Sequence, residues 1–169
     1  MTNVLTLRLD DGAQAHFEAL RQRYFPPERN QIPAHLTLFH TLPDTEVVRR
    51  ALESAAQAQE PFSLAVTGVR SLGKGVAYKL ASGACTALHA RLAKSVAKDL
   101  TAQDRQRIQP HIVVQNKVTP AAARELLREL ECAFAPMEVE AVGMDLWHYM
   151  GGPWELADTF LFGAGGGRM

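Results

Sequence analysis

Residues 35–40 read HLTLFH, and residues 110–116 read PHIVVQN. Each stretch places a histidine at the start of an apolar run, directly after Ala34 in the first case and Pro110 in the second. Short apolar runs of this kind favour strands. We therefore expect two similar strands that each begin with a histidine, and the rest of the chain is organised around them.

The polar side chains should gather on one face of each strand, because successive side chains of a strand point to opposite sides. In the first strand this face holds His35, Thr37 and Phe39, and the opposite face holds Leu36, Leu38 and His40. In the second strand it holds His111, Val113 and Gln115, opposite Ile112 and Val114. Burying an unpaired polar group costs about 1–3 kcal/mol. The histidine faces should therefore border water, a polar partner or a ligand.

The surroundings of the two histidines match, which indicates an internal repeat. A segment that runs from proline to glycine starts 26 residues after His35, as PFSLAVTG, and 25 residues after His111, as PMEVEAVG. Any strand–helix–strand protein shows some such rhythm, but the agreement of His, Pro and Gly together favours duplication. Two β-α-β-α-β lobes about a pseudo-twofold axis would bring the histidine strands together.

The predicted fold class is α+β, with two pseudo-symmetric lobes of strands, helices outside and a central cleft. One domain is expected over residues 1–163, followed by a flexible tail, 164–169. Strands are predicted over 4–9, 35–42, 62–72, 75–81, 111–118, 137–150 and 154–162, and helices over 11–24, 47–58, 83–100 and 121–134. Asp10 or Asp11, Asp44 and Thr119 are the expected helix caps.

Composition and charge exclude some functions. A chain of 169 residues with 47% hydrophobic and 21% charged residues is that of an ordinary globular protein. Its 18 basic and 18 acidic side chains balance, which argues against a non-specific coat on nucleic acid. Cys85 and Cys132 lack metal-ligand spacing and are expected to be buried thiols of a reducing compartment. With no signal-peptide pattern and no spanning apolar run, a cytoplasmic monomer without membrane contact is expected.

Two histidines on facing strands suit one kind of chemistry. The unperturbed pKa of histidine lets one copy start neutral and the other protonated near pH 7. Such a pair can act as general base and general acid in the cleavage of a phosphodiester. Hydroxyl groups beside them can donate hydrogen bonds to the phosphate as negative charge develops. This chemistry needs no metal and no cofactor.

The tandem histidine motifs, the first strand and the late stretch GPWELADTF resemble the 2H phosphoesterase superfamily, specifically its 2′-5′ RNA ligase (LigT-like) branch. The resemblance covers about residues 3–163. It implies a bilobal α+β fold and action on RNA-related phosphates, either opening 2′,3′-cyclic phosphodiesters to 2′-phosphates or making and breaking 2′-5′ linkages. The implied partner is an RNA 3′ end or a small nucleotide with a cyclic phosphate.

The resemblance assigns roles to four positions. His35 and His111 match the two catalytic histidines, and Thr37 matches the hydroxyl that binds substrate phosphate. Val113 stands where the family has Thr or Ser, and valine cannot donate to a phosphate. Members also often carry a basic residue shortly after the second motif, where this chain has an asparagine followed by Lys117.

Other candidates have two interpretations each. Arg105 and Arg107 lie upstream of the second histidine and either neutralise substrate phosphate or belong to a solvated loop. Residues 147–149 (Trp-His-Tyr) form either a base-stacking face or core and strand edge. Residues 73–75 (Gly-Lys-Gly) resemble a phosphate-binding loop only superficially, since no helix follows at the required spacing.

Three functions therefore compete. The first is a metal-independent cyclic phosphodiesterase or ligase, in which the sequence does not assign the acid and base roles. The second is a non-catalytic protein that binds RNA ends or nucleotides, which Val113 supports. The third is a metal hydrolase that uses His35, His40, His111 or His148. That interpretation is disfavoured because His35 and His40 are expected on opposite faces and no carboxylate stands at ligand spacing.

Overall fold

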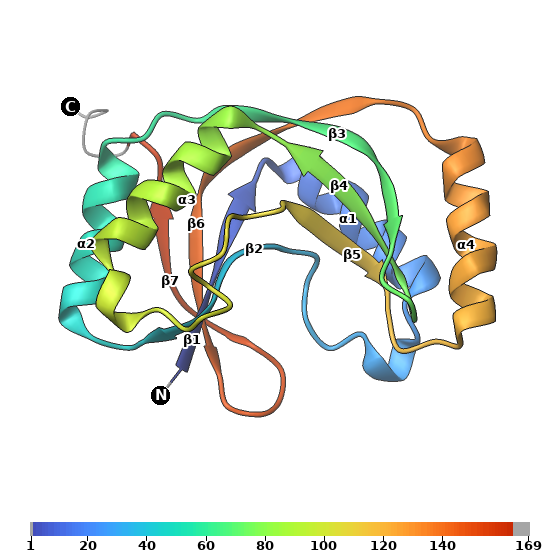
Figure 1. Cartoon of the computed structure of the whole chain (residues 1–169), viewed down its shortest axis with the longest axis horizontal. Helices are drawn as coiled ribbons and strands as arrows, with labels where there is room; N and C mark the ends of the chain where they lie inside the picture. The colour runs from blue at the N-terminus through green and yellow to red at the C-terminus, as the bar shows by residue number, and fades with distance from the viewer. Residues whose placement is uncertain (1, 164–169) are drawn as a thin grey trace.

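All seven predicted strands and four predicted helices are present in residues 2–163, the part of the chain that the computed structural model describes (Figure 1). The strands are β1 (Thr2–Leu9), β2 (Leu36–Pro43), β3 (Phe62–Ser71), β4 (Val76–Ala81), β5 (His111–Gln115), β6 (Met137–Tyr149) and β7 (Glu155–Leu161). The helices are α1 (Asp11–Tyr24), α2 (Glu46–Gln57), α3 (Gly83–Ser95) and α4 (Pro120–Ala133). The predicted α+β class is confirmed, whereas the tail, 164–169, lies outside the described residues.

Each α-helix begins at a side chain that accepts a hydrogen bond from a backbone N–H of its first turn. Asp10 caps α1 and Thr119 caps α4, as predicted. The predicted cap Asp44 is wrong, because Thr45 caps α2 while the Asp44 carboxylate accepts from Arg49. The helix predicted to reach residue 100 stops at Ser95, where the chain leaves helical geometry and forms a short 3-10 turn, η2 (Ala97–Asp99).

The strands form one antiparallel sheet in the order β2-β1-β6-β3-β4-β5, with β7 paired to β6. Exchanging β1 with β4, β2 with β5 and β3 with β6 reverses this order and keeps every pairing among these six strands, whereas β7 has no counterpart among the strands of residues 2–163. The sheet order therefore has the pseudo-twofold symmetry that the sequence repeat predicts. The two histidine strands occupy corresponding places in it, one at each end.

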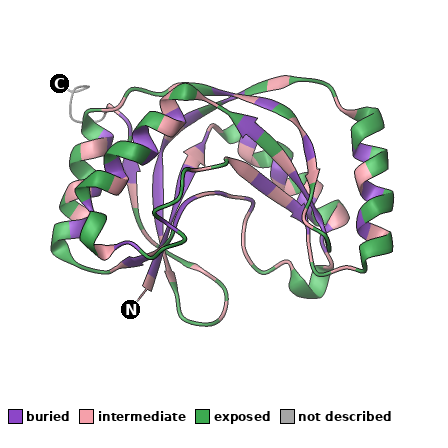
Figure 2. Cartoon of the chain, viewed as in Figure 1, coloured by how far each residue is buried: buried purple, intermediate pink, exposed green. Residues whose placement is uncertain are grey.

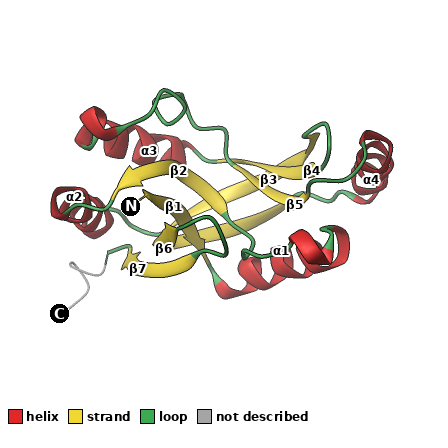
Figure 3. Cartoon of the chain, turned by 90° about the horizontal axis from the view of Figure 1, so that it is seen from below, coloured by secondary structure: helices red, strands yellow, loops and turns green. Residues whose placement is uncertain are grey.

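The helices exchange sides between the two halves. Helix α1 follows β1 but contacts β5, and α3 follows β4 but lies beside α2. Figures 1 and 3 show α2 and α3 at one end of the sheet and α1 and α4 at the other. Each half thus covers part of the other, so the two lobes share their packing.

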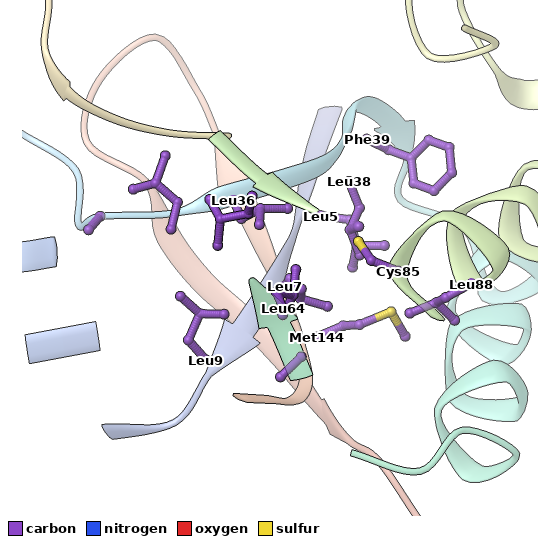
Figure 4. Close-up of a cluster of buried hydrophobic side chains, with 14 of the residues drawn as sticks. Leu5, Leu7, Leu9, Leu36, Leu38, Phe39, Leu64, Cys85, Leu88 and Met144 are labelled. Atoms are coloured by element: carbon purple, nitrogen blue, oxygen red, sulfur yellow. The ribbon is translucent and has the colours of Figure 1, made fainter. Parts of the chain in front are cut away.

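The core lies between the sheet and the inner faces of the helices, which Figure 2 shows as buried. Figure 4 shows Leu5 and Met144 of the sheet close to Leu88 and Cys85 of α3. Each fully buried side chain of this size stabilises the fold by about 1.5–3 kcal/mol. Cys85 is buried as predicted, and burial raises the pKa of its thiol to about 12. The prediction for Cys132 is wrong, because it lies on the exposed side of α4.

Strand β2 contains an irregularity that the alternation argument missed. Thr37 pairs with Thr6, but Phe39 pairs with the next residue of β1, Leu5, across a register shift. Such a bulge turns the following side chains by one place. Phe39 is therefore in the core, with its ring stacked on His89 at 4.5 Å between centroids.

Candidate functional site

The two histidine strands meet although they are the opposite ends of the sheet order. The sheet curls until β2 and β5 contact each other (Figure 1). A cavity of about 350 Å³ lies beside this contact, lined by Thr37 of β2, His111 of β5 and the segment before β5 that includes Arg107. The sequence predicted that these three residues would share a site, and the cavity brings them together.

The two histidines are held in the same way. His35 Nδ1 lies 2.9 Å from the carbonyl oxygen of Pro33, and His111 Nδ1 lies 2.8 Å from the carbonyl oxygen of Gln109. A carbonyl oxygen only accepts, so each Nδ1 carries the hydrogen. In each neutral ring Nε2 is then the nitrogen able to take up a proton. The pseudo-twofold symmetry therefore extends from the strands to the tautomers.

His35 is packed against an aromatic side chain that the sequence analysis did not select. The rings of His35 and Trp154 lie 4.7 Å apart between centroids. Desolvation by burial lowers the pKa of His35 to about 4. The hydrogen bond to the Pro33 carbonyl opposes this change, and the charges of Arg21 and His111 lower the pKa further. His35 is therefore neutral at pH 7. The one signal in the sequence was an aromatic residue directly after the Gly-Gly-Pro turn.

Arg21 is a second residue that the sequence analysis missed. It is only 2% exposed, on the buried stripe of α1 with Ala13 and Phe17. Its Nη1 donates to the carbonyl oxygen of Val113 at 3.0 Å and its Nε donates to Asn30 at 3.1 Å. No salt bridge holds it within residues 2–163. The guanidinium carbon also lies 4.2 Å from the centroid of the Phe25 ring, so protein oxygens and an aromatic face surround this buried charge.

Thr37 and Val113 occupy corresponding positions in the two strands. Thr37 lines the cavity, and Val113 is half-buried between the fully buried Ile112 and Val114. Because valine has no hydroxyl, the second strand lacks the hydrogen-bond donor that Thr37 provides on the first. The Arg21 guanidinium, bound to the carbonyl oxygen of Val113, brings positive charge to the same strand.

The family model of the 2′-5′ RNA ligase superfamily matches residues 9–153. The chain belongs to this superfamily. Membership supports a phosphoester-processing function of the 2H type. A comparison with curated proteins finds no match.

Solved structures share the fold of this superfamily member. TT0787 of Thermus thermophilus matches with a TM-score of 0.69 and 16% identity, over 96% of this chain and 98% of that one. Escherichia coli LigT complexed with 3′-AMP matches with a TM-score of 0.62 and 16% identity, over 95% and 97%. LigT complexed with ATP matches with a TM-score of 0.59 and 16% identity, over the same shares. Within residues 2–163 no helix is long and apolar enough to cross a membrane.

The two candidate arginines upstream of His111, Arg105 and Arg107, are placed differently. Arg107 lines the cavity, as its candidate role requires. Arg105 does not; its Nη2 donates to the carbonyl oxygen of Ala97 on an exposed loop. Arg70 of β3 also lines the cavity and donates to Gln109, a contact that nothing in the local sequence indicated.

Residues 147–149 do not form one stacking face in this superfamily member. Trp147 donates from Nε1 to Thr6, and its ring lies 6.1 Å from that of Trp154. The His148 ring bonds to Asn3, and Tyr149 is exposed at the end of β6. The alternation of β6 places His148 on the face opposite to Trp147 and Tyr149.

Two sequence candidates remain, the Gly-Lys-Gly segment at 73–75 and the metal site that would use several histidines. Residues 73–75 close the β3–β4 turn, where a side chain on Gly75 would collide with the backbone of Gln115. This glycine lets the turn approach the second histidine strand. The argument that His35 and His40 point to opposite sides is wrong in detail, since His40 borders the same cavity as Thr37. Even so, residues 2–163 contain no group of three His, Cys, Asp or Glu able to hold a metal ion.

Proposed function

We propose that this member of the 2′-5′ RNA ligase superfamily is a metal-independent phosphodiesterase that opens 2′,3′-cyclic phosphate ends by two-histidine acid/base catalysis. The observation that carries the proposal is the matched pair His35 and His111, each with Nδ1 bound to a carbonyl oxygen and Nε2 left for proton transfer. Positioned acids and bases of this kind each contribute about 10²–10⁴ in rate.

In the proposed reaction His35 is the base, because its lowered pKa keeps it neutral. His35 Nε2 takes a proton from water, whose oxygen attacks the phosphorus of the cyclic diester. The bond from phosphorus to the ribose 3′ oxygen breaks, and His111 in its protonated form gives its Nε2 proton to that oxygen. The product is a 2′-phosphate with a free 3′ hydroxyl. In the ligating direction the two roles exchange.

The developing negative charge needs stabilisation at the phosphate oxygens. Thr37 supplies a hydroxyl donor at the cavity wall, and Arg21 supplies a fixed positive charge near His35. Donors aimed at developing charge in a site that excludes water contribute strongly to the rate. Trp154 supports this by covering His35.

The proposed substrate is an RNA 3′ end or a small nucleotide with a cyclic phosphate. The complexes of LigT with 3′-AMP and with ATP support a nucleotide ligand in this fold. We further propose that the protein acts as a cytoplasmic monomer without a metal or cofactor.

A second candidate is a non-catalytic protein that binds nucleotides or RNA ends, and the missing hydroxyl at Val113 favours it. Turnover of purified protein on 2′,3′-cyclic nucleotides and on RNA with a 2′,3′-cyclic end separates the two. We expect measurable turnover that is largely lost in His35→Ala and in His111→Ala, with the double variant little worse than either. Binding without turnover supports the second candidate, and multiplicative losses contradict a shared site.

A further inference from the structure

His40, which lines the cavity together with His111, is held by a buried carboxylate. The Asp104 side chain is 1% exposed and lies 3.0 Å from His40 Nδ1. The same carboxylate accepts from the backbone N–H groups of His40 and Thr41 at 2.9 Å each. The His40 ring itself is 48% exposed. With Nδ1 bound to Asp104, Nε2 is the polar atom that the ring can offer to a ligand.

The groups around His40 suit an anion. Arg70 and Arg107 line the same cavity, together with the amide side chains of Gln103, Gln106 and Gln109. The one carboxylate among the lining residues is Asp104, whose oxygens are already bound to the N–H groups of β2. The cavity therefore presents donors and positive charge, with its negative charge turned inward.

The position of His40 separates it from the reacting phosphate. His40 follows Thr37 by three residues, and a strand rises about 3.3 Å per residue, which places the two backbones up to about 10 Å apart. One phosphate group does not bridge that separation, so an anion bound at His40 would have to be a second phosphate of the same ligand. The bulge in β2 turns His40 to the cavity and so creates the place for it.

We propose that His40, Arg70 and Arg107 form a second anion subsite, which binds the phosphate on the 5′ oxygen of the nucleotide whose 2′,3′-cyclic phosphate reacts. The inference rests on the proposed function and deepens it. That phosphate is either the diester to the preceding nucleotide of an RNA or a free 5′-monophosphate. The preferred substrate is therefore an end that carries this second phosphate, rather than a nucleoside 2′,3′-cyclic phosphate alone.

The test compares three substrates that share one base: cytidine 2′,3′-cyclic phosphate, its 5′-phosphorylated form, and the dinucleotide CpC with a 2′,3′-cyclic end. We expect the second phosphate to raise kcat/KM about tenfold to a hundredfold, as a charge-assisted contact does. His40→Gln should reduce this ratio to near one, and Arg107→Gln should reduce it in part. His16→Gln, an exposed histidine on α1, is the control and should leave all three rates unchanged. If kcat/KM rises only for CpC, the subsite binds the diester between two nucleotides. If it rises equally for CpC and for the 5′-phosphorylated mononucleotide, the subsite binds a phosphate of either kind.

Equal kcat/KM values for the three substrates, or a ratio that survives His40→Gln, would overturn the subsite. If the wild type turns over none of them, the proposed function fails, and the subsite is tested alone by binding. Titration with cytidine 3′-phosphate and with CpC bearing a 3′-phosphate should then give at least a tenfold lower Kd for the dinucleotide. That difference should vanish in His40→Gln, and its persistence there would reject the subsite. Thermal melting confirms that each variant is folded.

Discussion

Replacing Trp154 by alanine should shift the acid side of the activity profile. The indole packs on His35, and desolvation is the main cause of the lowered pKa of that residue, about 4. Admitting water returns the pKa toward the ordinary value of 6.5. At pH 5 the neutral fraction of His35 is then expected to fall from about 0.9 to as little as about 0.03, a loss of up to about 30-fold. At pH 8 the ring is neutral in both proteins, so the loss should be small.

The assay is kcat/KM on a cyclic phosphate substrate from pH 4 to 8.5, with the titration of the His35 ring followed by NMR. Tyr149→Ala, which removes an exposed aromatic ring at the end of β6, is the matched control. It should leave the acid side of the pH–activity profile as in the wild type. A His35 titration that stays near pH 4 without the indole would refute the reasoning, because the covering ring would then not be what keeps water away. Equal losses at pH 5 and pH 8 would assign Trp154 to substrate binding instead.

Three further changes are predicted. Val113→Thr adds a hydroxyl donor at nearly constant volume, so turnover should rise, but by less than the factor of about 10²–10³ that an ideally placed donor contributes. Urea unfolding should show that the free energy of unfolding falls by at most about 1–2 kcal/mol. A much larger fall would place the Val113 side chain in the core. Arg21→Met removes two charge-assisted hydrogen bonds and should lower the free energy of unfolding by about 2–4 kcal/mol. The same change should raise the pKa of His35 measured by NMR, because the charge of Arg21 lowers it, and this rise distinguishes the electrostatic effect of Arg21 from its effect on packing. Activity should survive EDTA, because imidazoles move the protons; restoration of lost activity by zinc or manganese would favour the metal hydrolase.

The sequence predicted the strands and the helices because these follow from local periodicity, and it predicted the meeting of the two histidine strands because this follows from the repeat. His35 and His111 could be paired from equivalent spacing alone, and so could Thr37 with Val113. Phe39 and His40 were misplaced because the bulge in β2 depends on its pairing with β1, which alternation within one strand does not reveal.

The residues missed at the site depend on contacts between distant parts of the chain. Arg21 lies on an ordinary buried stripe of α1, and its hydrogen bond to β5 joins it to Val113, 92 residues later in the chain. Trp154 reaches His35 through the loop between β6 and β7, more than a hundred residues away along the chain. Nothing in the local sequence indicates the contact of Arg21, and the aromatic residue after the Gly-Gly-Pro turn does not reveal which residue Trp154 contacts.

The exchange of helices between the two halves has a consequence for synthesis on the ribosome. When the chain has emerged only as far as α2, it holds His35 but neither β5 nor the Asp104 segment that completes the cavity. Helix α1 then lacks the strand on which it packs, so its apolar stripe stays uncovered. A nascent first half therefore lacks the complete cavity. The cavity between the two histidine strands forms only when the second half has been made and has packed onto the first.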